Sequence, residues 1–217
     1  MKKLLICLVL IVATVSMASA LDLNYGLRTG VVLGNMSVDP DPADLEPGLE
    51  AKMKMGFYCG LWARHMMNEK MGITAELNYV EKGDRYAEEG TGVTMHWIMY
   101  NNVLELPVLF TYLPSEKFAL FAGPVLEYVL SSGYKMLYDI DDPDVAEYMG
   151  YDFGEWTNRI GFSIAAGATY QINETFFGEV RYTYGFSNVI GDDNELMPAE
   201  GLEAVPRTLT IGVGINL

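Results

Sequence analysis

Eight segments of this chain alternate apolar and polar residues with a period of two. Because successive side chains of an extended chain point to opposite sides, each segment predicts a β-strand with two unlike faces. The predicted strands are Leu23–Asn35, Lys54–His65, Met71–Lys82, Trp97–Leu113, Lys117–Ser131, Asn158–Ile172, Thr175–Ser187 and Arg207–Leu217. This pattern limits the fold to the all-β class, as a sandwich or a closed barrel.

The connections between these strands alternate in length. The short ones are Met66–Lys70, Pro114–Glu116 and Asn173–Glu174, and the long ones are Met36–Met53, Gly83–His96, Ser132–Thr157 and Asn188–Pro206. Short turns on one side and long loops on the other, with an even strand number, are typical of bacterial outer-membrane barrels. We therefore predict an eight-stranded antiparallel up-and-down transmembrane β-barrel with its short turns and both termini in the periplasm.

One face of the predicted strands has no charge in its middle. In the last strand this face holds Leu209, Ile211, Val213, Ile215 and Leu217, and over all eight strands it carries only Glu81 and Arg207, both beside long loops. A cation at the bilayer midplane costs about 2–4 kcal/mol, so an uncharged middle is what a lipid-facing surface requires.

The same face carries aromatic residues near both strand ends. Near the short turns these are Tyr25, Tyr112, Phe118, Tyr170 and Phe176; near the long loops they are Phe57, Tyr79, Tyr100, Tyr128, Tyr184 and Phe186. Two aromatic girdles around an aliphatic band are a membrane-interface pattern. The pattern favours the membrane barrel over a soluble sandwich.

The opposite face collects charged residues of both signs. Its bases are Arg28, Lys54, Arg64, Lys82, Arg159 and Arg181, and its acids are Glu76, Glu105, Glu127 and Glu179. Unpaired buried charges are costly, so we expect these ten side chains to form a charge network across the lumen. An eight-stranded barrel is just wide enough to be filled by side chains, which explains the many Gly, Ser and Thr residues on this face.

Two prolines interrupt the predicted strands. Short-turn pairing would set Pro107 opposite Gly123, with Pro124 beside it. Each proline removes a hydrogen-bond donor from the ladder. The sequence therefore predicts a bulge or kink where the fourth and fifth strands meet.

The first residues have the pattern of a secretory signal peptide. Lys2 and Lys3 precede an apolar run that is too short to span a bilayer, and Ala18 and Ala20 form an A-x-A cleavage signal. We expect residues 1–20 to be the signal peptide and residues 21–217 the barrel domain. Cys59 is then the remaining cysteine, so an intramolecular disulfide is not expected.

The net charge of −15 is concentrated in the predicted long loops, which hold 20 acidic residues against Lys52, Arg85 and Lys135. Such a surface repels nucleic acid, so we expect no nucleic-acid partner. We interpret the loops as a solvated, repelling exterior. Divalent-cation binding by the run Asp139–Asp144 is the alternative, although its spacing does not match a calcium-binding loop.

Motifs for catalysis or cofactor binding are missing from the sequence. No G-x-S-x-G, H-E-x-x-H, C-x-x-C or P-loop motif occurs, and the two histidines are His65 and His96. We expect no enzyme activity, no cofactor and no metal. A hydrolase with His96 and a loop Asp or Ser at the rim is the enzymatic alternative.

Several segments together resemble the PorT-like outer membrane protein β-barrel domain family. They are Tyr25–Gly30, Glu76–Gly83, Leu104–Leu109, Phe121–Leu126 and Leu209–Gly214, and the resemblance covers nearly all of residues 21–217. It implies location in the bacterial outer membrane, and some relatives serve protein secretion. The family supplies no catalytic residues. One departure is Leu217 at the end of the chain, where outer-membrane barrels commonly have an aromatic residue.

We therefore expect a non-enzymatic barrel with a structural, interaction or secretion-accessory role through its acidic extracellular loops. Its expected partners are outer-membrane lipid, the barrel-assembly machinery and an envelope or secretion protein. A narrow small-solute pore is one alternative, and it requires a gap in the charge network. A soluble periplasmic lipocalin-like carrier is another, and it requires the apolar face to turn inward.

Overall fold

The computed structural model describes residues 23–39, 49–90, 93–140, 151–152, 159–188 and 203–217. The expected signal peptide, with Ala18 and Ala20, lies outside the described residues, as does most of the run Asp139–Asp144. The strands are β1 (Asn24–Asp39), β2 (Leu49–Met66), β3 (Met71–Gly90), β4 (Val93–Ser115), β5 (Phe118–Ile140), β6 (Tyr151–Asp152), β7 (Ile160–Gln171), β8 (Phe176–Gly185) and β9 (Glu203–Asn216). In these ranges no helix is long and apolar enough to cross a membrane.

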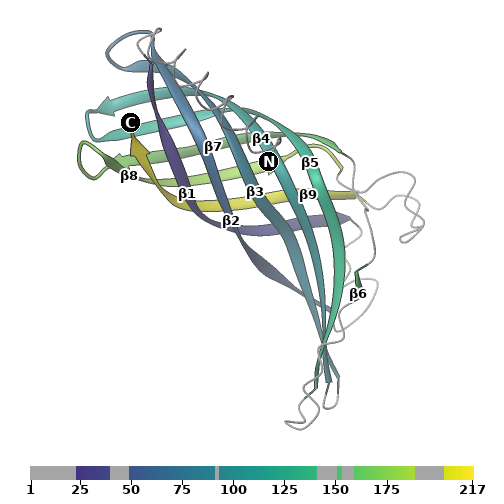
Figure 1. Cartoon of the computed structure of the whole chain (residues 1–217). Coiled ribbons are helices and arrows are strands. Elements are labelled where there is room, and N and C mark those ends of the chain that lie inside the picture. Colours follow the sequence, from purple (N-terminus) through teal and green to yellow (C-terminus); the bar gives the residue numbers. More distant parts are fainter. Residues whose placement is uncertain (1–22, 40–48, 91–92, 141–150, 153–158, 189–202) are drawn as a thin grey trace, which may run out of the picture.

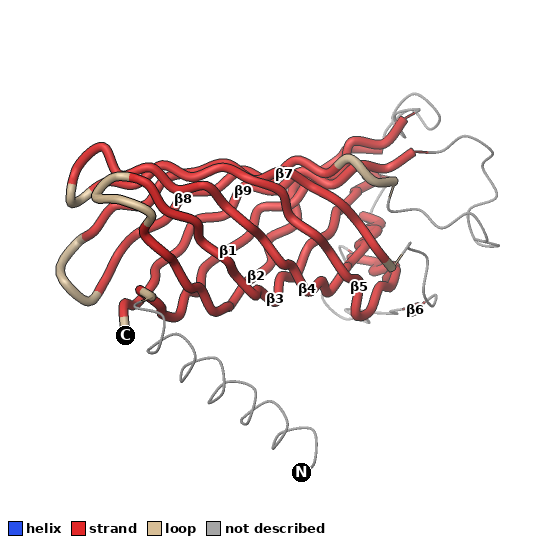
Figure 2. The backbone as a smooth tube through the Cα atoms, turned by 90° about the horizontal axis from the view of Figure 1, so that it is seen from above, coloured by secondary structure: helices blue, strands red, loops and turns tan. Residues whose placement is uncertain are grey.

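Eight of these strands form a closed antiparallel barrel. Their order is β4-β3-β2-β1-β9-β8-β7-β5, and the pairing of β4 with β5 closes the ring. The two-residue strand β6 only pairs with β5 at Lys135 and Met136. Figures 1 and 2 show the barrel with its short turns and its C-terminus at one end. The predicted eight-stranded barrel is confirmed.

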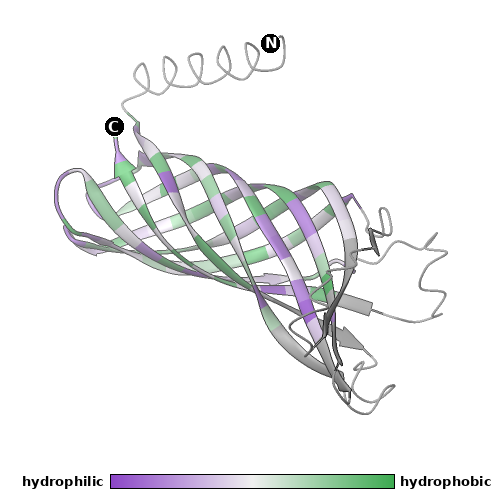
Figure 3. Cartoon of the chain, turned by 60° about the horizontal axis from the view of Figure 1, so that its bottom comes forward, coloured by the Kyte–Doolittle hydropathy of each residue, from purple (hydrophilic) through white to green (hydrophobic). Residues whose placement is uncertain are grey.

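The apolar face of the strands points outward and the charged face points inward. Ile211 and Val213 are 47% and 51% exposed, whereas Arg28 and Glu127 are 4% and 5% exposed. Figure 3 shows the resulting alternation of hydrophobic and hydrophilic residues along each strand. A lipocalin-like carrier requires the opposite arrangement, with its apolar face around the ligand. The orientation is that of a barrel embedded in lipid.

The expected girdle residues lie on the outer side. Phe57 contacts Tyr79 with ring centroids 5.6 Å apart, and Tyr184 contacts Phe186 at 5.2 Å. The outer surface carries further exposed rings that the prediction omits, namely Phe110, Phe162 and Tyr182. Aromatic residues on the outer surface are therefore more numerous than two narrow girdles would require.

Large inward side chains lie against glycines one or two strands away. A Cβ atom at Gly214 would lie 2.0 Å from Phe177 Cζ, and one at Gly212 would lie 2.1 Å from the Tyr58 hydroxyl oxygen. Trp62 packs edge-on against Phe177, with ring centroids 5.6 Å apart. Glycine thus makes room on the wall for rings that fill the lumen, as the narrow diameter of such a barrel demands.

Several strands extend well past the predicted boundaries. β3 and β4 continue to Gly90 and from Val93, so the predicted loop Gly83–His96 is largely strand. β5 likewise continues to Ile140. A transmembrane β-strand needs about 9–11 residues, whereas β4 and β5 have 23 each. The prediction was wrong here because the outer side of a strand beyond the membrane faces water instead of lipid and needs no apolar residues.

The prolines do not shift the register. Pro107 lies opposite Val125 rather than Gly123, and the ladder resumes with Phe110 opposite Ala122 in the same register. The register shifts between β4 and β5 lie instead between Asn102 and Val103 and between Tyr112 and Ser115. The bulge expected at the prolines was therefore wrong, whereas the kink stays a prediction. The ladder between β4 and β5 lacks the rungs of Val108 and Leu109, because missing donors remove rungs but insert no extra residue.

Candidate functional site in the barrel lumen

The inward positions of β1, β3 and β8 bring four charged side chains together. We call Arg28, Glu76, Glu179 and Arg181 the short-turn cluster because they lie in the half of the barrel nearer the short turns. All four are at most 7% exposed. The cluster carries two positive and two negative charges and is therefore balanced.

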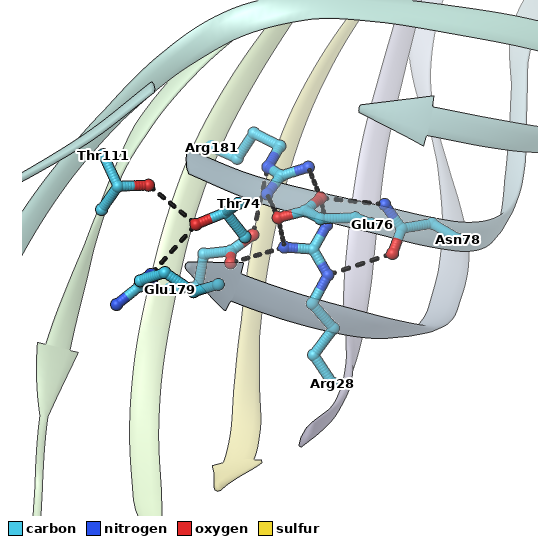
Figure 4. Close-up of polar contacts among 8 residues, drawn as sticks. Arg28, Thr74, Glu76, Asn78, Thr111, Glu179 and Arg181 are labelled. Atoms are coloured by element: carbon cyan, nitrogen blue, oxygen red, sulfur yellow. Dashed lines mark hydrogen bonds and ion pairs between the residues drawn. The ribbon is translucent and has the colours of Figure 1, made fainter. Parts of the chain in front are cut away.

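Glu76 is the centre of the short-turn cluster. Arg181 donates to both of its carboxylate oxygens through Nη1 and Nη2, at 2.8 Å each, and Arg28 Nη1 donates to Oε1 at 2.8 Å. Glu179 accepts from Arg28 Nη1 at 2.8 Å and lies 3.2 Å from Arg181 Nε. Figure 4 shows both guanidinium groups turned toward Glu76. Charge-assisted and bidentate hydrogen bonds of this kind are the strong ones.

A glycine on the strand between them lets Arg28 and Asn78 meet. Gly60 of β2 is paired with Arg28 on one side and with Asn78 on the other. Arg28 Nε donates to Asn78 Oδ1 at 3.1 Å, and a Cβ at Gly60 would lie 2.1 Å from that oxygen. Side chains two strands apart can therefore bond because the middle strand presents none.

A second group lies farther toward the long loops. We call Lys82, Glu105 and Glu127 the loop-side cluster. Lys82 Nζ lies 2.6 Å from Glu105 Oε1 and 2.9 Å from Glu127 Oε1, and Ser163 donates a hydrogen bond to Glu127. One ammonium group thus neutralises one of two carboxylates, and the loop-side cluster keeps an excess negative charge.

The other three expected network residues lie apart from these clusters. Arg64 Nε donates to Thr74 Oγ1 at 3.0 Å. Lys54 lies 2.7 Å from Glu81 Oε1, a residue that the sequence places on the outer face. Arg159 is exposed just before β7 and is not a buried lumen residue. The alternation of β7 would direct Arg159 toward the lumen. However, Arg159 precedes the first residue of β7 and therefore lies at the end of the barrel.

The interior is open at the short-turn end and nearly filled by side chains deeper in the barrel. A cavity of about 630 Å³ opens between the short turns and is lined by Trp62 and Arg64 among others. The adjoining space, lined by Arg28, Glu76 and Glu179 as well as by Trp62 and Arg64, has a volume of about 10 Å³. That is about the space one water molecule requires. The space beside the short-turn cluster is thus nearly filled by side chains.

A family model described as "Outer membrane protein beta-barrel domain" matches residues 16–191. The chain belongs to this family. It is accordingly a protein of the bacterial outer membrane. No curated protein matches it.

Solved structures similar to this outer-membrane barrel cover nearly its whole length at low identity. Ail, the attachment invasion locus protein of Yersinia pestis, is 13% identical, covers 89% of this chain and 98% of its own, and has a TM-score of 0.45. Neisserial surface protein A is 11% identical, with coverages of 89% and 97% and a TM-score of 0.46. OprG from Pseudomonas aeruginosa is 15% identical, with coverages of 89% and 95% and a TM-score of 0.39.

The charge network of this family member also has uncharged partners, which were not predicted from the sequence. Arg28 lies 5.5 Å from the centroid of the Tyr58 ring, and Arg181 lies 4.8 Å from that of Phe121. The rings supply favourable surroundings for buried guanidinium groups. Glycines across from the rings, such as Gly30 opposite Tyr58 and Gly167 opposite Phe121, are the sequence signal that could have identified them.

Residues considered for chemistry lie away from the lumen. His65 is exposed, and His96 Nδ1 lies 3.3 Å from Arg85 Nη2 beyond the membrane. Among the described residues, no group of three or more His, Cys, Asp or Glu side chains is placed to hold a metal ion. The arrangement of the lumen is suited to holding the barrel closed.

Proposed function

We propose that this protein is a non-enzymatic outer-membrane barrel that acts as an interaction module, with its lumen closed. The proposal covers a structural or secretion-accessory role, which is what the resemblance to PorT-like proteins implies. The observation that carries it is the near-complete filling of the interior beside the short-turn cluster, where the free space measures about 10 Å³.

The closure is supported by the strength of the contacts at this point. Four buried charged side chains are joined by six contacts of 2.5 to 3.2 Å between guanidinium nitrogens and carboxylate oxygens. Opening a path for a solute would separate charges in a medium where they interact strongly. A wide pore would need a polar lumen lined by water instead.

The extension of the strands beyond the membrane supports the interaction role. Figure 1 shows β3, β4 and β5 reaching past the ends of β7 and β8. Their register places Met95 opposite Tyr138 and Trp97 opposite Met136. Aromatic residues and methionine are enriched in protein interfaces. We infer that this extension, formed by residues 83–102 and 131–140, contacts an envelope or secretion protein.

The proposal also includes two other expected partners, outer-membrane lipid and the barrel-assembly machinery. The outward apolar residues contact outer-membrane lipid, and the barrel-assembly machinery inserts the chain. The acidic balance of the whole chain, −15, disfavours a nucleic-acid partner.

Conductance of the purified barrel in a planar lipid bilayer tests the closed lumen. Folding is checked first by the slower or faster migration of unheated protein in a denaturing gel. We expect no steady single-channel steps above the level of protein-free bilayers. Reproducible steps from the folded protein would favour the narrow small-solute pore instead.

A shortened variant tests the extension. Replacing residues 86–97 by a two-residue Asn-Gly turn rejoins β3 and β4 closer to the barrel, because the flanking residues Arg85 and Ile98 lie opposite each other in the ladder. We expect a folded barrel that no longer crosslinks to the envelope protein bound by the full chain. Unchanged crosslinking of the shortened, folded barrel would refute the role of the extension.

A further inference from the structure

The cavity at the short-turn end has the dimensions of a ligand pocket. Its volume is about 630 Å³. Small-molecule sites commonly measure about 300–1,000 Å³. Its lining consists of Asn24, Tyr25, Trp62, Arg64, Met66, Asn68, Glu69, Leu113, Gln171, Glu174, Asn216 and Leu217, all within the described residues. Because short turns face the periplasm in outer-membrane barrels, the pocket opens to that compartment.

Arg64 lies between this pocket and the closed part of the lumen, since it lines both spaces. Its Nε donates to Thr74 Oγ1 at 3.0 Å, and its guanidinium carbon lies 5.4 Å from the centroid of the Trp62 ring. Thr74 is itself held by Thr111, with 2.8 Å between the hydroxyl oxygens. The guanidinium group is thus fixed by one hydrogen bond and one ring at the inner end of the pocket.

The charge of Arg64 is not balanced within the described residues. Glu76 and Glu179 are already engaged by Arg28 and Arg181, and no described carboxylate forms an ion pair with Arg64. Three arginines therefore face two glutamates in this half of the lumen. A partly buried guanidinium with free Nη donors favours an anion, above all a carboxylate that matches its fork geometry.

The outer end of the pocket has the opposite charge. Glu69 and Glu174 line it and are exposed on two short turns. Two carboxylates at the entrance disfavour a multiply charged anion such as phosphate, but they favour a cationic group. The pocket therefore has a cationic inner end and an anionic outer end.

We propose that this pocket binds short peptides with free ends from the periplasmic side. The C-terminal carboxylate of the peptide contacts Arg64, and its ammonium group lies toward Glu69 and Glu174. Amide side chains on the lining, such as Asn24, supply donors and acceptors for the peptide backbone. The site is separate from the extension on the other side of the membrane, so either can be tested without the other.

Nuclear magnetic resonance of the detergent-solubilised barrel, labelled with ¹⁵N at arginine and tryptophan, tests the proposal. Triglycine is titrated while the Trp62 indole and Arg64 Nε signals are followed. We expect saturable shifts of both signals. Triglycine amide, which lacks the carboxylate, should bind about tenfold more weakly or worse. Equal affinity for the amide, or no saturation below about 10 mM triglycine, would overturn the proposal.

Two substitutions and one competitor sharpen this test. Arg64→Gln should abolish the triglycine shifts at Trp62, whereas Arg207→Gln, at the long-loop end, should leave them unchanged. Glu69→Gln with Glu174→Gln should weaken triglycine but not N-acetyltriglycine. Inorganic phosphate that displaces triglycine at equal concentration would show a general anion site and would refute peptide binding.

Discussion

The two charged clusters of the lumen differ in how their buried carboxylates are paired with cations. In the short-turn cluster each of two carboxylates contacts both guanidinium groups, so charge and hydrogen bonds are shared. In the loop-side cluster a single ammonium group lies between Glu105 and Glu127. The charge balance of the short-turn cluster therefore depends on each of its four members. The loop-side cluster, by contrast, becomes neutral when it loses one carboxylate.

The largest effect should come from Glu76→Ala, because this change leaves Glu179 as the single carboxylate beside Arg28 and Arg181 in the short-turn cluster. Removing one partner of a buried ion pair costs about 3–5 kcal/mol. The measurement is urea unfolding in phospholipid vesicles, followed by tryptophan fluorescence. The matched control is Glu69→Ala on an exposed turn, which should change the free energy of unfolding little. Equal stability of the two variants would refute the central role of Glu76.

The next largest effect should come from Lys82→Met. It leaves Glu105 and Glu127 without a cation, at an expected cost of about 3 kcal/mol in the same unfolding assay. Lys117→Met, at an exposed position beside a short turn, is the control. If Lys82→Met destabilised the barrel more than Glu76→Ala, the loop-side cluster would be the more important of the two.

A smaller effect is expected from Gly214→Val, which adds atoms where Phe177 lies against the wall. The new Cβ would lie 2.0 Å from Phe177 Cζ. Overpacking of this kind costs about 1–3 kcal/mol. Adding Phe177→Leu should restore part of the loss, and a double-mutant cycle measures the coupling. Purely additive effects would contradict the proposed contact.

The smallest effect should come from Glu127→Gln. The amide keeps the size of the side chain and leaves Lys82 paired with Glu105, so the cluster becomes neutral. We expect a change below about 1 kcal/mol in the free energy of unfolding. A loss as large as that of Glu76→Ala would show that the two clusters do not differ in the way described.

The barrel could be predicted because lipid imposes a pattern on the sequence. Inside the membrane every outward residue must be apolar, so alternation identifies the faces of residues such as Ile211 and Arg28. The extension of β3 and β4 could not be predicted in this way, because residues 83–96 do not alternate regularly between apolar and polar. The same reasoning explains why Glu81, near the water, pairs with Lys54 from the other face.

The individual contacts of the lumen were less predictable than its charge. Alternation places Arg28 and Glu76 inside, but it does not say which charges meet, because that depends on the tilt of the strands and on which neighbours are glycine. Gly60 decides that Arg28 reaches Asn78. The inward rings of Tyr58 and Phe121 were missed because aromatic residues were sought on the lipid side only.

The outward direction of the apolar face is the central feature of this barrel. Site-directed spin labelling of β9 tests this direction most directly. In a Cys59→Ser background, cysteines are placed in turn at Thr208, Leu209, Thr210, Ile211 and Val213, and the labelled protein is reconstituted in lipid vesicles. Labels at 209, 211 and 213 should collide frequently with oxygen dissolved in lipid, and labels at 208 and 210 should not. The reverse pattern would contradict the account.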